Sequence, residues 1–91
     1  LGDNQSVAEC LITIGEIAAM HGDGERATRL FGAADAQMRS MGFKLLAPEQ
    51  AEYERNLQSA RAQLGEERWV EAWAEGKAMS SGVAASYALE L

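Results

Sequence analysis

The sequence is constrained most by the short turn at residues 21–25, HGDGE, because apolar helical patterns stand directly on both sides of it. Before the turn, the spacing of one helix face is kept by Val7, Leu11, Ile14 and Ala18, with Cys10 and Ile17 beside them. After the turn, the same spacing continues in Ala27, Leu30, Phe31, Ala34, Met38 and Met41. Two helices joined by so short a turn must lie antiparallel. The sequence therefore predicts a helical hairpin.

The turn carries residues suited to ending one helix and starting the next. Gly22 can adopt the left-handed conformation that follows many helix C-termini, and Asp23 can cap the helix that follows. Glu25 suits the positive end of that helix dipole. Close approach of the two backbones is favoured by the small residues Gly15, Ala18, Ala27 and Ala34.

Three further helices are predicted after the hairpin. The third begins at Pro48, ends before Gly65 and carries the apolar face Tyr53, Leu57, Ala60 and Leu64. The fourth follows at once with Trp69, Val70, Trp73 and Ala74, and a short fifth has Val83, Tyr87, Ala88 and Leu91 at helical spacing. We therefore expect an all-α chain with five helices near residues 4–21, 24–41, 48–64, 66–77 and 81–90. The fifth helix would either start another hairpin or cap an exposed end.

The order of residues across the hairpin resembles a tetratricopeptide repeat, whose unit is roughly 34 residues long. Between Ala8 and Met41, the characteristic large, small and aromatic positions are filled by Leu11, Ile14-Gly15, Ala18, Ala27, Phe31 and Ala34. The hairpin departs from the repeat pattern in having Leu11 where Trp is usual and no Pro at its end. The resemblance implies antiparallel hairpins stacked as a right-handed superhelix.

Several sequence segments are similar to the end of the helical-repeat region of large bacterial signal-transduction ATPases. These proteins include LuxR-family transcriptional regulators and relatives that carry a nucleotide cyclase domain. The similar segments are RLFGAADAQMRSMG, PEQAEYERNL and AWAEGKAMS. The resemblance implies a regulatory scaffold that contacts a protein, a small ligand or the ATPase switch domain of its parent chain. Because Leu1-Gly2-Asp3 is not a natural start, we expect residues 1–91 to be a single module excised from a larger protein.

Charge and composition argue against several classes of function. The net charge is -6 and the basic residues are scattered, which disfavours direct contact with nucleic acid. No apolar run is long enough to cross a bilayer, and a single cysteine fits the reducing cytoplasm. Cys10 is expected to be a small core residue and His21 an exposed helix-end residue, too far apart in one helix to act as a pair. With no phosphate-binding, dinucleotide or metal motif either, we predict no cofactor and no enzymatic activity.

Two kinds of site follow from the predicted architecture. In a repeat stack, a partner binds the concave face formed by the first helix of each pair, and here that face would carry Asn4, Glu9, Thr13, Glu16 and Met20. The alternative is a pocket for a small ligand near Tyr53, Trp69 and Trp73, although two tryptophans one turn apart are more typical of a core. The acidic run Glu66, Glu67, Glu71 and Glu75 is expected to be a solvated helix face, with a basic partner surface as the alternative. Exposed repeat ends would favour homo-oligomers.

Overall fold

The structure, a computed structural model, describes residues 4–42 and 44–89, without the side chains of residues 4–6 and 81. It contains five helices, α1 (Asn4–Met20), α2 (Gly24–Met41), α3 (Ala47–Leu64), α4 (Glu66–Lys77) and α5 (Ser81–Leu89), and no strand within those ranges. The predicted all-α class is confirmed, and each helix boundary lies within one residue of its expected position. The predicted end of the fifth helix at residue 90 falls outside the described residues.

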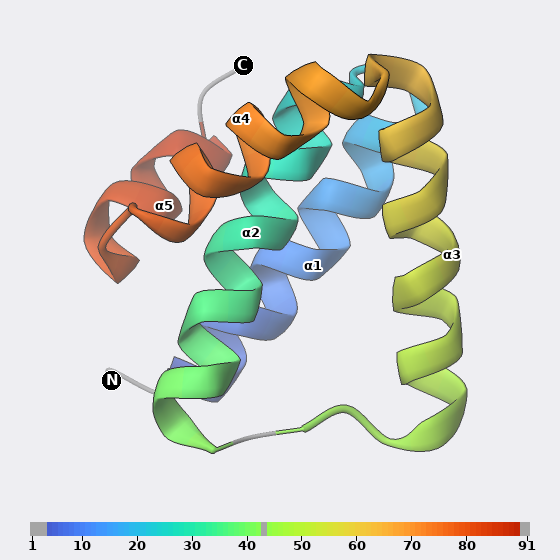
Figure 1. Cartoon of the computed structure of the whole chain (residues 1–91). Coiled ribbons are helices and arrows are strands. Elements are labelled where there is room, and N and C mark those ends of the chain that lie inside the picture. The colour runs from blue at the N-terminus through green and yellow to red at the C-terminus, as the bar shows by residue number, and fades with distance from the viewer. Residues whose placement is uncertain (1–3, 43, 90–91) are drawn as a thin grey trace.

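The turn between α1 and α2 has the predicted caps. Gly22 has a φ of 79°, in the left-handed region. The Asp23 carboxylate accepts a hydrogen bond from the Arg26 backbone N–H at 3.1 Å, and the Asp23 N–H donates to the Ala18 carbonyl at 2.9 Å. These bonds satisfy polar groups at the facing ends of both helices and fix the antiparallel pairing seen in Figure 1.

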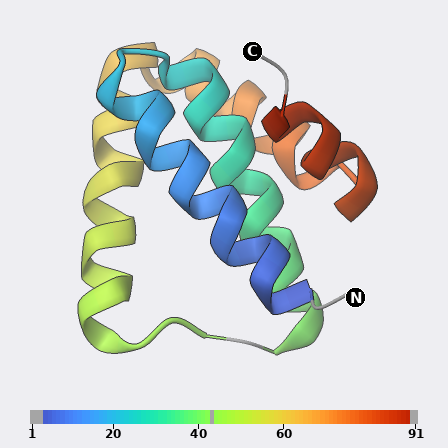
Figure 2. The same cartoon turned by 180° about the vertical axis from the view of Figure 1, so that it is seen from behind.

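Helix α2 is the centre of the molecule and contacts each of the other helices. Helix α1 lies along it, α3 flanks the α1–α2 hairpin, and α4 crosses α2 (Figure 1). Helix α5 folds back onto α1 and α2, so that α1 has α3 on one side and α5 on the other (Figure 2). Both expectations for the fifth helix, the start of another hairpin and a cap over an exposed end, stay predictions. The tetratricopeptide-like superhelix stays a prediction.

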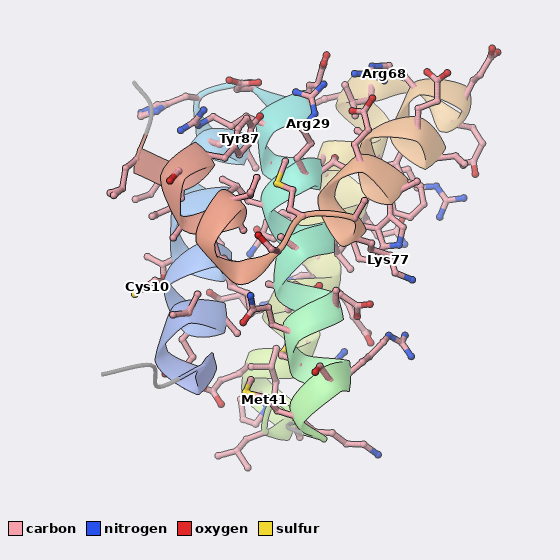
Figure 3. All side chains as sticks on the ribbon, turned by 90° about the vertical axis from the view of Figure 1, so that its left-hand side faces the viewer. Cys10, Arg29, Met41, Arg68, Lys77 and Tyr87 are labelled. Atoms are coloured by element: carbon pink, nitrogen blue, oxygen red, sulfur yellow. The ribbon has the colours of Figure 1, made fainter. Side chains whose placement is uncertain are left out.

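The buried face of α1 is rotated from the predicted one. It is formed by Ala8, Leu11, Ile12, Gly15, Ala18 and Ala19. Cys10 and Ile17 are exposed, so the expectation that Cys10 belongs to the core is wrong, and Figure 3 shows its side chain pointing outward. The reason is a close contact at Gly15, where an added Cβ would lie 2.7 Å from the Phe31 ring. Phe31 fills this space and turns the small-residue side of α1 toward α2.

A second close contact joins α2 to α4 through glycine on both helices. A Cβ on Gly32 would lie 2.7 Å from the Trp73 carbonyl oxygen, and a Cβ on Gly76 would collide with the Arg29 backbone. Because α4 meets α2 along Ala72 and Gly76, the predicted apolar face of α4 is only partly right. Its two tryptophans, Trp69 and Trp73, are half-buried, whereas Val70 and Ala74 are exposed.

Helix α5 is held by two arginines of α2. The Arg26 guanidinium donates to the backbone carbonyls of Tyr87 and Ala88 at 2.8 and 3.1 Å and lies over the Tyr87 ring. The Arg29 guanidinium donates to the Tyr87 hydroxyl at 3.2 Å (Figure 3). The buried residues of α5 are Ala84 and Ala88. Val83, expected on the apolar face, is 55% exposed, and residue 91 lies outside the described part.

Candidate partner-binding groove

A groove of about 370 Å³ lies between α1 and α3. It is lined by Glu9, Ile12, Thr13 and Glu16 of α1, by Leu45 of the connection, and by Glu49 and Glu52 of α3. Figure 1 shows α3 diverging from the α1–α2 hairpin toward the start of α3. Helices α1 and α3 are the first helices of the two predicted pairs, the elements expected to form a partner-binding face.

Helical spacing explains how the polar residues reach this groove together. Glu9, Thr13 and Glu16 stand four and then three residues apart, so they share one face of α1. Glu49 and Glu52, three residues apart, share one face of α3 in the same way. The Thr13 hydroxyl donates to the Glu9 backbone carbonyl at 3.0 Å, and Glu9 is exposed.

The electrostatics of the groove are dominated by carboxylates. Four glutamates line it, and none of the described residues lining it is basic. Burial, together with the neighbouring Glu52, raises the pKa of Glu16, although the Asn56 amide donates a hydrogen bond to the Glu16 carboxylate at 2.9 Å. The raised pKa means that ionised Glu16 is unfavourable beside a second carboxylate. A cationic partner would relieve this repulsion.

The structure brings together three of the five residues predicted for the partner face, Glu9, Thr13 and Glu16. Met20 is 83% exposed at the end of α1 and does not line the groove. Asn4 begins α1, but its side chain falls outside the described part.

Sequence reasoning missed the other wall of the groove, formed by Glu49 and Glu52. The signal was present in their spacing of three residues after Pro48. Acidic residues in this position are also favoured simply by the positive end of the helix dipole. Their role in the groove depends on the angle between α3 and α1, which no local pattern encodes.

The residues of the alternative ligand pocket have other contacts in this structure. The Tyr53 hydroxyl donates to the Phe31 carbonyl at 3.2 Å, and the two rings meet edge to face. Burial raises the pKa of the Tyr53 phenol. Trp69 and Trp73 stack at 5.2 Å between ring centroids, with the Arg61 guanidinium 4.7 Å from the Trp69 ring. The ligand pocket stays a prediction.

The acidic run on α4 differs from the groove because arginines pair with three of its four carboxylates. Arg61 pairs with Glu66 at 2.5 Å. Arg68 pairs with Glu71 at 3.3 Å, and Glu75 pairs with both Arg68 and Arg29. These bonds lower the pKa of Glu75, the hydrogen bond from Arg29 most of all. Arginines therefore offset much of the negative charge on α4, whereas none of the described residues lining the α1–α3 groove is basic.

Within residues 4–42 and 44–89, no group of three or more histidine, cysteine, aspartate or glutamate side chains is arranged to hold a metal ion. No helix in the same ranges is both long and apolar enough to span a membrane.

Comparison with models of known protein families, with curated proteins and with solved structures gave no significant match. The resemblance to the helical-repeat region of LuxR-family regulators and signal-transduction ATPases therefore rests on the three sequence segments alone.

Proposed function

We propose that this chain is a non-enzymatic protein-interaction module of a bacterial regulatory protein, and that its α1–α3 groove receives a basic segment. The segment belongs either to another protein or to another domain of the same parent chain, such as an ATPase switch domain. The observation that carries the proposal is the composition of the groove. Four glutamates, two from α1 and two from α3, face a common hollow in which none of the described lining residues is basic.

The groove suits lysine and arginine side chains in two ways. Its apolar lining, Ile12 and Leu45, can pack against their aliphatic stems while the charged ends reach the carboxylates. Each exposed ion pair contributes only about 0.2 to 1 kcal/mol, so useful affinity requires several pairs along an extended segment. The net charge of -6 favours rapid association with such a segment, since complementary charge raises association rates.

The proposal is tested with a lysine-rich peptide of roughly ten residues that lacks apolar side chains. The variant Glu9→Lys/Glu52→Lys changes one exposed carboxylate on each wall of the groove, and we expect it to weaken binding by about tenfold or more. The matched control is Glu66→Lys/Glu67→Lys, which makes the same charge change on α4. Isothermal titration calorimetry at two salt concentrations measures both, and binding should weaken as salt rises.

Two results would overturn the proposal. One is equal loss of binding in both double variants, which would show attraction to net charge without a defined groove. The other is unchanged binding in the groove variant. Circular dichroism of each variant checks that the helices are retained.

A further inference from the structure

A hydrogen bond between Glu16 and Asn56 joins the two walls of the α1–α3 groove. The Asn56 amide on α3 donates to the Glu16 carboxylate on α1 at 2.9 Å, and both side chains are half-buried. A carboxylate only accepts hydrogen bonds, so the amide presents its NH2 group to Glu16. Glu16 lines the groove, whereas Asn56 stands behind it on α3 and does not. Asn56 can therefore act on the groove through Glu16.

The charge of Glu16 is subject to opposing influences from α3. Burial, and then the neighbouring Glu52, raise the pKa of Glu16, whereas the hydrogen bond from Asn56 lowers it. Glu52 and Asn56 stand four residues apart, so one face of α3 carries both the group that opposes ionised Glu16 and the group that favours it. The balance decides whether Glu16 is available to a basic side chain, because a neutral carboxyl group forms no ion pair.

The other charged groups of the groove are also carboxylates. Glu49 and Glu52 on α3 face Glu16 across the groove, and Glu9 stands two turns away on the same helix as Glu16. No described residue lining the groove comes from α2 or α5. In these surroundings, the Asn56 amide gives ionised Glu16 a favourable contact before any partner arrives.

We infer, on the basis of the function proposed above, that Asn56 is a positioning residue of the α1–α3 groove. It holds Glu16 in place and ionised, and so sets the lowest pH at which the groove binds a basic segment. Binding should weaken as the pH falls through the titration of Glu16. Without Asn56 the neutral form of Glu16 persists to a higher pH, so binding should fail at a higher pH.

Two variants of Asn56 are compared with a control on the same helix. Asn56→Ala removes the donor, and Asn56→Asp keeps the shape of the side chain but replaces the donor with an acceptor. The control is Gln63→Ala, since the Gln63 amide also bonds α3 to α1, at 3.1 Å, but through the neutral carbonyl of Ala19. Both alanine variants remove one bond between the same two helices, and only Asn56→Ala removes a bond to a carboxylate.

Two pH titrations are made on the whole chain. Carbon-13 nuclear magnetic resonance follows the Glu16 side-chain carboxyl group in the free chain, and isothermal titration calorimetry follows binding of the same lysine-rich peptide. We expect Asn56→Ala to move both midpoints to higher pH by about half a unit, which is roughly a threefold change in the ratio of ionised to neutral Glu16. Asn56→Asp should move them further because it adds a like charge. Gln63→Ala should leave both midpoints in place.

The outcomes separate this role of Asn56 from the proposed function. Peptide binding with unmoved midpoints in both Asn56 variants would overturn the role of Asn56 and leave the proposed function standing. So would an equal shift in Gln63→Ala, because the effect would then come from loosened packing of α3 on α1. A shifted Glu16 titration without a shifted binding midpoint would also overturn it. No peptide binding by the unchanged chain at any pH would overturn the proposed function and, with it, the role of Asn56.

Discussion

The substitution Gly76→Ala probes the contact that sets the position of α4 on α2. The added Cβ would lie within 3.0 Å of the Arg29 Cα, carbonyl carbon and carbonyl oxygen. Since these are backbone atoms, no rotamer change can relieve the overlap, and the two helices must separate. Replacing glycine by alanine inside a helix contributes about 1 kcal/mol of stability, whereas overpacking costs about 1 to 3 kcal/mol and occasionally more. The obstacle is rigid, so we expect a net loss of about 2 kcal/mol.

Such a loss should lower the melting temperature by roughly 10 °C in a domain of this size. The assay is thermal unfolding followed by circular dichroism, with urea unfolding followed by tryptophan fluorescence. Gly82→Ala is the matched control, because a Cβ there would meet nothing within 4 Å. This control should be neutral or stabilising by up to about 1 kcal/mol. Equal stability of the two variants would refute the argument that Gly76 is required for the crossing.

Three further predictions concern α5, the acidic groove and the tryptophans. Tyr87→Phe removes the hydrogen bond from Arg29 at a cost of about 0.5 to 1.5 kcal/mol. Amide hydrogen exchange should therefore accelerate in α5 and not in the α1–α2 hairpin, and equal acceleration in both would contradict local opening of α5. Folding raises the pKa of Glu16 above its ordinary value of 4.5, so the folded chain favours the neutral carboxyl group. The stability that this preference provides is fully present at a pH below 4.5 and is lost as the pH rises through the raised pKa. Glu16→Gln should therefore stabilise the chain against urea at pH 7 but not at pH 3, and equal gains at both would count against the desolvation argument. Trp73→Ala should lower the free energy of unfolding by about 2 to 3 kcal/mol because the side chain is half-buried against the core. An unchanged melting temperature with lost binding of a small ligand would favour the small-ligand pocket instead.

The positions of the helices could be predicted because local residues encode them. Gly22 and Asp23 end one helix and cap the next, Pro48 lies in the first turn of α3, and Gly65 separates α3 from α4 with a φ of 84°. Apolar spacing between these markers was sufficient to place each boundary. Such signals act over a few residues and need no knowledge of the tertiary fold.

The faces of α1 and α4 were harder to predict from the sequence. Helix α1 is apolar on most of its circumference, so spacing alone could not distinguish the stripe through Leu11 from the one through Ile17. On α4 the tryptophans dominated the prediction, although Gly76 makes the closest approach to α2. Judged from the local sequence, a glycine inside a helix only lowers helix stability. Its role in close helix packing can be recognised only when the position of the opposing helix is known.

The residues of the candidate groove were likewise predictable only in part. Glu9, Thr13 and Glu16 could be grouped from the sequence because they share one face of one helix, and they line one hollow. Glu49 and Glu52 were not assigned to that site because they join it only through the packing of α3 beside α1. The sequence thus predicted one wall of the groove, and the tertiary structure was needed for the other.

Nuclear magnetic resonance can show residue by residue whether a basic segment binds in the α1–α3 groove. The isotope-labelled chain is titrated with the lysine-rich peptide and the amide shifts are followed residue by residue. If the groove is the binding site, the largest shifts should fall at residues of both walls, Glu9, Thr13, Glu16, Glu49 and Glu52. Shifts centred on the acidic run of α4, at Glu66, Glu67 and Glu71, would contradict it.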